Sequence, residues 1–201
     1  MHRTARITAA LLSLTLAGVA HAQQPQAARD ETLRAELLIR GQKDQEVRQV
    51  FMTGQADSAA IARMNAVDAS NTIFLKKVVA ERGWPGASLV GRDGEQAAFL
   101  IAQHAVLDTA FMAQVLPLVE RAYAAGEAEG QQVALLTDRI ARHRGRPQVY
   151  GTQASIVNGR FVLDPIADSA NVDARRAKLG IPPVARYMRL LDSLYNSARG
   201  P

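Results

Sequence analysis

One histidine in this chain lies where its side chain could do acid–base chemistry. His104 follows Leu100 and Ile101 and precedes Leu107 at helical spacing, on or beside the apolar face of a predicted helix. An imidazole in such a position needs a hydrogen-bonding partner, and Asp108, four residues later, is a candidate on the same side. His104 is therefore either a hydrogen-bonded core residue or a general acid or base that works near neutral pH.

Local ion pairs can explain two acidic residues of the predicted helices. Asp44 precedes Arg48, and Asp138 precedes Arg142, by the four residues that bring side chains together on a helix. Such a pair contributes about 0.3–0.5 kcal/mol when it is exposed. Asp138 has a second interpretation, in which it orients His104 or a water molecule.

Two adjacent arginines near the end of the chain could hold an anion. Arg175 and Arg176 follow Asp168 and Asp173, so either guanidinium could pair with a carboxylate of the chain or fork onto a carboxylate or phosphate of a ligand. Adjacent residues do not share one face of a short helix, so a structural role as a clamp between the loop and its surroundings is an equal alternative.

A β-hairpin is predicted from about residue 148 to residue 164. Asn158-Gly159 lies between two β-prone runs, and both residues tolerate the positive φ angles of a type I′ turn. This turn sets the register, with position 157 opposite 160 and position 153 opposite 164. The alternation of a strand then points Tyr150 and Thr152 inward, and Gln153 outward beside Asp164.

Helices must position most of these residues. Capping residues, glycines and prolines divide the remaining chain into helical segments with short connections. We expect helices at about 30–53, 58–83, 95–113, 117–125, 131–143, 172–179 and 182–198, with 88–94 as a turn or short strand. The predicted fold class is mainly α (α+β), with residues 30–201 as a single helical domain that contains one late β-hairpin at about 148–164.

The N-terminus predicts export. Arg3 and Arg6 precede the apolar run 7–19, and Ala20-His21-Ala22 precedes a Gln-rich stretch, which is the order of a secretory signal peptide. We expect residues 1–22 to be the signal peptide, residues 23–29 a disordered linker, and the mature protein to be periplasmic or secreted. The apolar run is shorter than the roughly 20 residues that span a bilayer. No other apolar segment reaches that length, so no membrane span is expected in the mature chain.

Composition excludes several classes of function. Removal of Arg3 and Arg6 with the signal peptide lowers the net charge from +5 to +3, which gives no indication of nucleic-acid binding. The absence of cysteine excludes disulfides and thiolate metal sites, and only His104 and His143 remain as histidine ligands, so no metal site is predicted. No phosphate-binding loop, dinucleotide fingerprint or nucleophile elbow occurs, so no cofactor is indicated either.

Short motifs along the chain resemble a known family. They are Gly83-Trp84-Pro85, Val90-Gly91, Gln103-His104, Leu116-Pro117, Leu135 with Asp138-Arg139, Gln148 with Tyr150-Gly151-Thr152-Gln153, Pro165-Ile166 with Asp168, and Val172-Asp173 with Arg175-Arg176 and Gly180. In this order, from about Asp44 to Tyr187, they resemble a bacterial domain-of-unknown-function family, number 6624. The family carries no established activity. The resemblance implies that these polar positions belong to one pattern, which favours a shared pocket.

Three functions are compatible with the sequence. The first is a binding module whose polar pocket holds a small polar or anionic ligand or a cell-envelope component such as a peptide; the second is a hydrolase-type enzyme with His104 as general acid or base. The third is a structural polar network without a ligand. We favour the binding module. The candidate catalytic residues are His104 and Asp138, and the candidate ligand-binding residues are Gln103, Arg139, Tyr150, Gln153, Asp173, Arg175 and Arg176.

Overall fold

The structure is a computed structural model that describes residues 29–52, 57–157 and 160–199. In these ranges the α-helices are α1 (Glu31–Met52), α2 (Ser58–Arg82), α3 (Ala87–His104), α4 (Thr109–Ala124), α5 (Gly130–His143), α6 (Val172–Lys178) and α7 (Val184–Arg199). The strands β1 (Ala154–Val157) and β2 (Arg160–Leu163) and a short 3₁₀ helix, Ser169–Asn171, complete the described part. The predicted fold class is confirmed. The predicted signal peptide, residues 23–28 and the Asn158-Gly159 turn lie outside the described residues.

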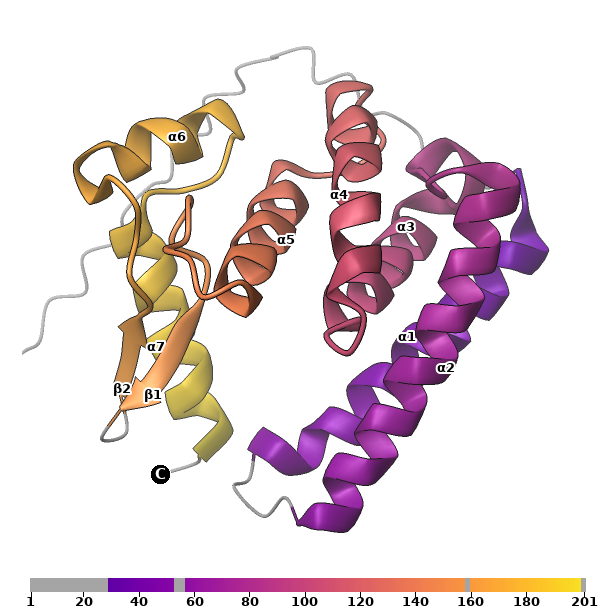
Figure 1. The fold of residues 1–201 in the computed structure, drawn as a ribbon, viewed down its shortest axis with the longest axis horizontal. Coiled ribbons are helices and arrows are strands. Elements are labelled where there is room, and N and C mark those ends of the chain that lie inside the picture. Colours follow the sequence, from indigo (N-terminus) through magenta and orange to yellow (C-terminus); the bar gives the residue numbers. More distant parts are fainter. Residues whose placement is uncertain (1–28, 53–56, 158–159, 200–201) are drawn as a thin grey trace, which may run out of the picture.

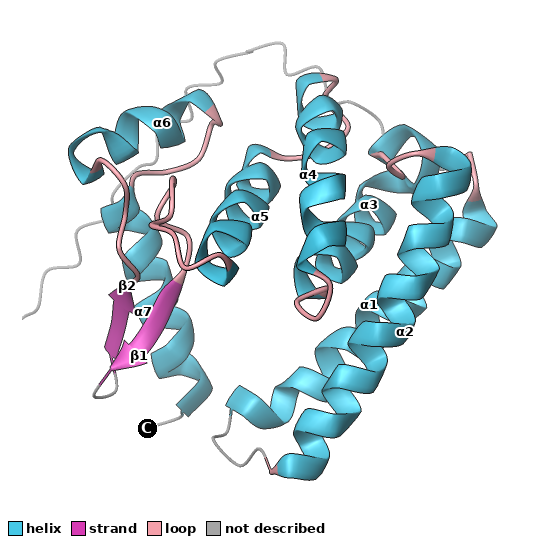
Figure 2. Ribbon diagram, in the orientation of Figure 1, coloured by secondary structure: helices cyan, strands magenta, loops and turns pink. Residues whose placement is uncertain are grey.

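Across the molecule, the helices follow roughly the order of the chain (Figure 1). The long helices α1 and α2 lie side by side, and α3 packs most extensively against α1. Next come α4 and α5, which pack on each other. The hairpin, α6 and α7 follow beyond α5, with β2 against α7, so the strands lie at one end of a helical assembly (Figure 2).

Capping residues set the ends of α1 and α2 as the sequence predicts. The carboxylate of Asp30 accepts a hydrogen bond from the backbone nitrogen of Leu33 at 2.9 Å, and that of Asp57 accepts one from Ala60 at 2.7 Å. Gly83 ends α2 with a φ of 75°, a conformation that costs least without a side chain. The two longest helices are therefore fixed by local chemistry.

The predicted boundaries in residues 88–113 are wrong, although residues 95–104 are helical as expected. Instead of a turn followed by one helix, the chain forms α3, in which Gly91 breaks the helical geometry with a φ of 74°, and then the separate helix α4. The carboxylate of Asp108 accepts a hydrogen bond from the backbone nitrogen of Phe111 at 3.0 Å and so begins α4. Because α3 ends at His104, the histidine lies at a helix terminus beside a loop.

The core lies between α1, α2, α3, α4 and α5. Its largest fully buried apolar side chains come from all five helices: Leu37, Leu75, Phe99, Ile101, Phe111, Met112 and Leu136. Burial of each such side chain contributes about 1.5–3 kcal/mol. Trp84, half-buried after the end of α2, packs against this cluster. The helices that carry the polar residues are therefore held in place by apolar packing.

The hairpin has the predicted register, but its first strand is shorter than expected. Ala154 pairs with Leu163, and Val157 with Arg160, whereas residues 148–153 form a loop. The expectation that Gln153 points outward is wrong, because its side chain is only 5% exposed. Gly151 has a φ of 67°, which ends the alternation of an extended strand, and a Cβ atom there would lie 2.8 Å from Ile166.

Candidate functional site

His104 is bound by an acidic residue from another helix. Its Nδ1 lies 3.0 and 2.9 Å from the two carboxylate oxygens of Asp44 in α1, and not against Asp108, which is bound to Lys76. A carboxylate accepts hydrogen bonds, so Nδ1 is the donor and carries a proton. Within the part of the chain that the structure describes, no group is bonded to Nε2. The His104 side chain is 14% exposed, so this second nitrogen is the one available for chemistry or recognition.

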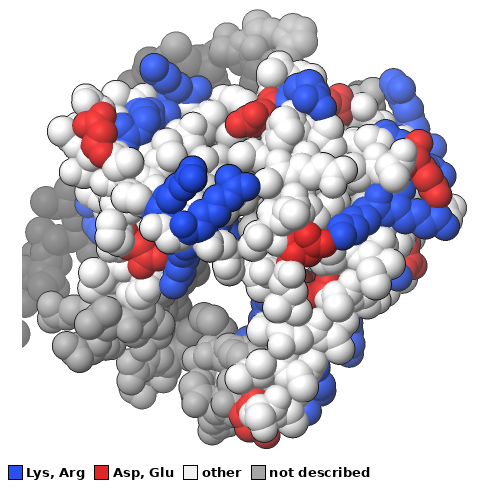
Figure 3. Space-filling model, viewed as in Figure 1, with Lys and Arg blue, Asp and Glu red and all other residues white. Residues whose placement is uncertain are grey.

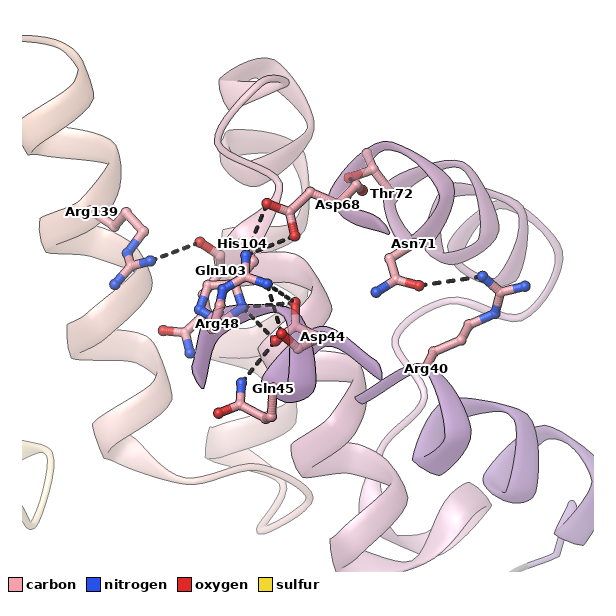
Figure 4. Close-up of polar contacts among 10 residues, drawn as sticks. All are labelled: Arg40, Asp44, Gln45, Arg48, Asp68, Asn71, Thr72, Gln103, His104 and Arg139. Atoms are coloured by element: carbon pink, nitrogen blue, oxygen red, sulfur yellow. Dashed lines mark hydrogen bonds and ion pairs between the residues drawn. The ribbon is translucent and has the colours of Figure 1, made fainter. Parts of the chain in front are cut away.

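Arg48 joins Asp44 to a second buried acid. Its guanidinium donates to Asp44 at 2.8 Å and to both oxygens of Asp68 in α2 at 2.7 and 2.8 Å (Figure 4). The predicted pair of Asp44 and Arg48 is thus confirmed, although Asp44 is fully buried. Gln45 also donates to Asp44, at 2.8 Å. These contacts fix the Asp44 carboxylate, which in turn fixes the His104 ring.

The charges of this network do not balance by themselves. Asp44 and Asp68 carry two negative charges when ionised, and Arg48 supplies one positive charge. Burial raises the pKa of Asp68, while the hydrogen bonds and charge of Arg48 act in the opposite direction. His104 and Arg139 are the other groups near this network that can carry a positive charge.

Arg139 brings a further cation to the same place. It extends from α5 toward the end of α3, where its Nη1 donates to the backbone oxygen of Gln103 at 3.2 Å (Figure 4). Its Nε is buried and has no partner within the described ranges. Burial lowers the pKa of Arg139, as does repulsion from Arg142 and Arg48. Among the described residues no carboxylate forms an ion pair with this guanidinium.

On the face shown in Figure 3, an opening lies beside the lower part of the α1–α2 pair. Asp44 and Arg48 come from α1, and Arg139 comes from α5. Lys and Arg side chains gather on the α5 side of this face.

Asp138, next to Arg139 in sequence, has a different environment. Its carboxylate accepts hydrogen bonds from the backbone nitrogens of Val149 at 2.6 Å, Tyr150 at 2.9 Å and Thr152 at 2.9 Å, and from the Thr152 hydroxyl at 2.9 Å. The side chain is fully buried. It does not pair with Arg142, which binds Asp164 at 3.1 Å instead. Asp138 therefore holds the loop 148–153 against α5.

Two glutamines complete this loop. The Nε2 of Gln148 donates to the backbone oxygens of Gln153 at 2.9 Å and Asp164 at 2.7 Å, and its Oε1 accepts from the backbone nitrogen of Gln153 at 2.8 Å. The side chain of Gln153 donates to the Thr152 hydroxyl at 3.1 Å. These bonds take the place of the strand pairing that the sequence predicts for this segment.

The two arginines of α6 bind backbone oxygens. Arg176 is fully buried and donates to the carbonyls of Pro182 at 2.5 Å and Tyr150 at 2.7 Å. Arg175 donates to the carbonyl of Val149 at 2.9 Å and pairs with Asp168 at 3.1 Å. They clamp α6 to the loop 148–153.

Asp173 and Tyr187 attach the last helix to the same assembly. Asp173 does not pair with Arg176 but accepts a hydrogen bond from the backbone nitrogen of Val184 at 2.8 Å. The Tyr187 hydroxyl donates to the carbonyl of Thr152 at 3.0 Å. Burial raises the pKa of Tyr187, whereas the charges of Arg176 and Arg139 lower it.

The candidate residues thus fall into two groups that meet at α5. Gln103, His104 and Arg139 lie with Asp44, Arg48 and Asp68, whereas the other candidates surround the loop: Asp138, Tyr150, Gln153, Asp173, Arg175 and Arg176. Tyr187 lies near cations of both groups. Sequence reasoning did not associate Asp68 or Tyr187 with a site and assigned Asp44 only a local pair, because long-range contacts leave no spacing signal in one sequence.

Within the described residues, no group of three or more His, Cys, Asp or Glu side chains could hold a metal ion. None of the described helices combines the length and apolar character needed to cross a membrane.

Comparison with known proteins identifies the family. The chain matches a family of unknown function, DUF6624, over residues 31–198, and it belongs to this family. No curated protein matches the chain. No solved structure matches it either.

Proposed function

We propose that this protein binds a small anionic ligand between Arg139 and His104. The supporting observation is the Arg139 guanidinium, which is largely buried, has an unpartnered Nε and forms no ion pair within the described residues. A cation removed from water is costly unless an anion neutralises it. A carboxylate or phosphate group, of a small molecule or a cell-envelope component, would supply that charge and match the geometry of a guanidinium.

His104 would provide the second contact. Asp44 holds its Nδ1 at 2.9 Å, so a protonated Nε2 can donate to the ligand from a fixed position. The pairs that Arg48 forms with Asp44 and Asp68 restrict the movement of this support. A rigid support reduces the entropy that ligand binding costs.

Titration calorimetry with inorganic phosphate, sulfate and acetate would test this proposal. Arg139→Gln should weaken binding about tenfold or more, because a charged hydrogen bond contributes about 1.5–3 kcal/mol. Arg63→Gln is the matched control, since Arg63 is an exposed arginine of α2. Equal binding by the two variants, or no binding of any of these anions by the native protein, would refute the proposed site.

A hydrolase-type enzyme is the second candidate function. A carboxylate on Nδ1 and an open Nε2 are the arrangement in which a histidine accepts a proton from water or a hydroxyl. Hydrolysis of p-nitrophenyl acetate and p-nitrophenyl phosphate provides an assay. His104→Gln separates the alternatives if its stability is measured in parallel. Lost turnover with native stability supports catalysis, lost phosphate binding alone supports recognition, and lost stability alone supports a purely structural network.

We also propose that the protein is exported to the periplasm or secreted. The support is the order of Arg3 and Arg6, the apolar run 7–19 and the Ala20-His21-Ala22 triplet, which is typical of a cleaved signal peptide. The intact mass of protein recovered from the periplasm of a bacterial host should correspond to a chain that begins at Gln23. A mass that includes residues 1–22, found only in the cytoplasm, would contradict this proposal.

A further inference from the structure

The end of α5 carries more positive charge than its contacts explain. Arg142 in the last turn and Arg144 and Arg146 after it are exposed. Asp164 forms an ion pair with Arg142 at 3.1 Å, and no other acidic side chain of the described residues pairs with any of these three. Cations favour the C-terminus of a helix, but that effect fades within the last turn. Arg144 is the C-cap of α5, and Arg146 lies two residues beyond it.

Arg139 and Arg142 are neighbours on one face of α5. They are three residues apart, so their Cβ atoms are about 5–6 Å from each other. The charge of Arg142 is one of the causes that lower the pKa of Arg139, and both charges also lower the pKa of His143. Their repulsion is therefore a property of the folded chain, and the ion pair of Arg142 with Asp164 does not remove it.

Arg142 keeps donors free for a ligand. Its Nε faces Asp164 and its Nη2 lies 3.4 Å from the Ser155 hydroxyl. Its side chain is 48% exposed, whereas Arg139 is largely buried. The pair thus offers one enclosed and one open guanidinium.

We infer that the ligand of the proposed site carries two anionic groups, with one held by Arg139 and His104 and the other by Arg142. This inference rests on the proposed function, because it adds a second contact to the same site. Two anionic groups joined by a short linkage occur in a diphosphate or a short dicarboxylate. Such a ligand would contact both arginines at once, and Arg144 and Arg146 would attract it toward the site.

Calorimetry at low salt with four probes tests this inference. Pyrophosphate should bind about tenfold or more tightly than inorganic phosphate, or succinate than acetate, and the preferred pair reports the chemistry of the anionic group. Arg142→Gln should remove the preference for the ligand with two anionic groups. Affinity for the ligand with one group, which Arg139 and His104 hold, should fall only by the smaller effect of the lost charge. Arg142→Lys should keep part of the preference, because it retains the charge without the fork. Arg63→Gln should behave as the native protein.

The possible failures are distinguishable. If none of the four anions binds to the native protein, the proposed function itself is refuted, and this inference with it. If ligands with one and with two anionic groups bind equally well to the native protein, or if Arg142→Gln retains the preference, the second anionic group is refuted and the site at Arg139 and His104 stands. Thermal denaturation of each variant shows that a lost preference does not come from unfolding.

Discussion

Glu95 should make the stability of this protein depend on pH near neutrality. It lies in the middle of α3 and is only 4% exposed. One carboxylate oxygen accepts from the indole nitrogen of Trp84 at 3.3 Å and the other from the amide of Gln132 at 2.8 Å. Both donors are neutral. Burial raises the pKa of Glu95 to about 7; Glu129 adds to this, whereas the two hydrogen bonds and Arg92 oppose it.

The direction and size of the effect follow from proton binding. Between pH 4.5, the ordinary pKa of the group, and about pH 7, the folded chain keeps a proton that the unfolded chain has released. The free energy of unfolding therefore falls as the pH rises through this window and levels off above it. At about 1.4 kcal/mol per pH unit, the loss amounts to about 3 kcal/mol.

Glu95→Gln tests this prediction because glutamine has the same shape and no charge. Urea denaturation at several values between about pH 5 and about pH 8 gives the free energy of unfolding of both proteins. The difference between their profiles cancels the contributions of other groups, including Asp68, whose pKa is also raised. The native protein should lose about 2.5 kcal/mol more than the variant over this range, because the rest of the loss falls below about pH 5.

The control is Glu120→Gln, which changes an exposed glutamate of α4. Its profile should run parallel to that of the native protein. If Glu95→Gln also gives a parallel profile, the carboxyl does not titrate in this window, and the argument from its burial is refuted.

Asp138→Asn tests the loop 148–153, and Gly130→Ala, with Gly126→Ala as its control, tests the packing of α5. Asp138→Asn should lower the free energy of unfolding by about 3 kcal/mol or more in urea denaturation, because several backbone donors lose a charged acceptor; native stability would contradict this role. Gly130→Ala should destabilise the protein by about 3 kcal/mol or more, since the new Cβ would lie 2.0 Å from the backbone oxygen of Leu179. Gly126→Ala, with a φ of 74° but open space around it, should cost only about 1 kcal/mol, and equal losses at the two glycines would contradict the steric argument.

Local signals explain which parts of the fold the sequence predicts. The caps at Asp30 and Asp57, the stop at Gly83 and the register of the hairpin depend on residues within one or two turns. Gly91 misleads because a helix continues on both sides of it, so a residue that normally ends a helix only breaks its geometry. Local propensity decides whether a segment forms a helix, a strand or a turn, unless tertiary packing imposes a different backbone conformation.

The segment 148–153 shows the limit of periodicity. Its sequence alternates as a strand would, yet Asp138 binds three of its backbone nitrogens and so competes with strand pairing. Gly151 provides the positive φ that the resulting loop needs. A buried carboxylate from another element is invisible in the local pattern, which is why the predicted position of Gln153 is wrong.

The same limit applies to His104. The sequence offers Asp108 at helical spacing, but that carboxylate caps α4, and Asp44, sixty residues away in the chain, takes the position beside the imidazole. Recognition of an anion requires Nε2 to carry a proton, whereas base catalysis requires it to be free. The network of Asp44, Arg48 and Asp68 has one negative charge more than positive when both acids are ionised. Arg139 extends from α5 to the same place and forms no ion pair among the described residues. An anion at Arg139 would lie beside the open Nε2 of His104, so the same geometry serves both functions. Phosphate binding and ester hydrolysis by His104→Gln, measured on the same samples, therefore decide between recognition and base catalysis.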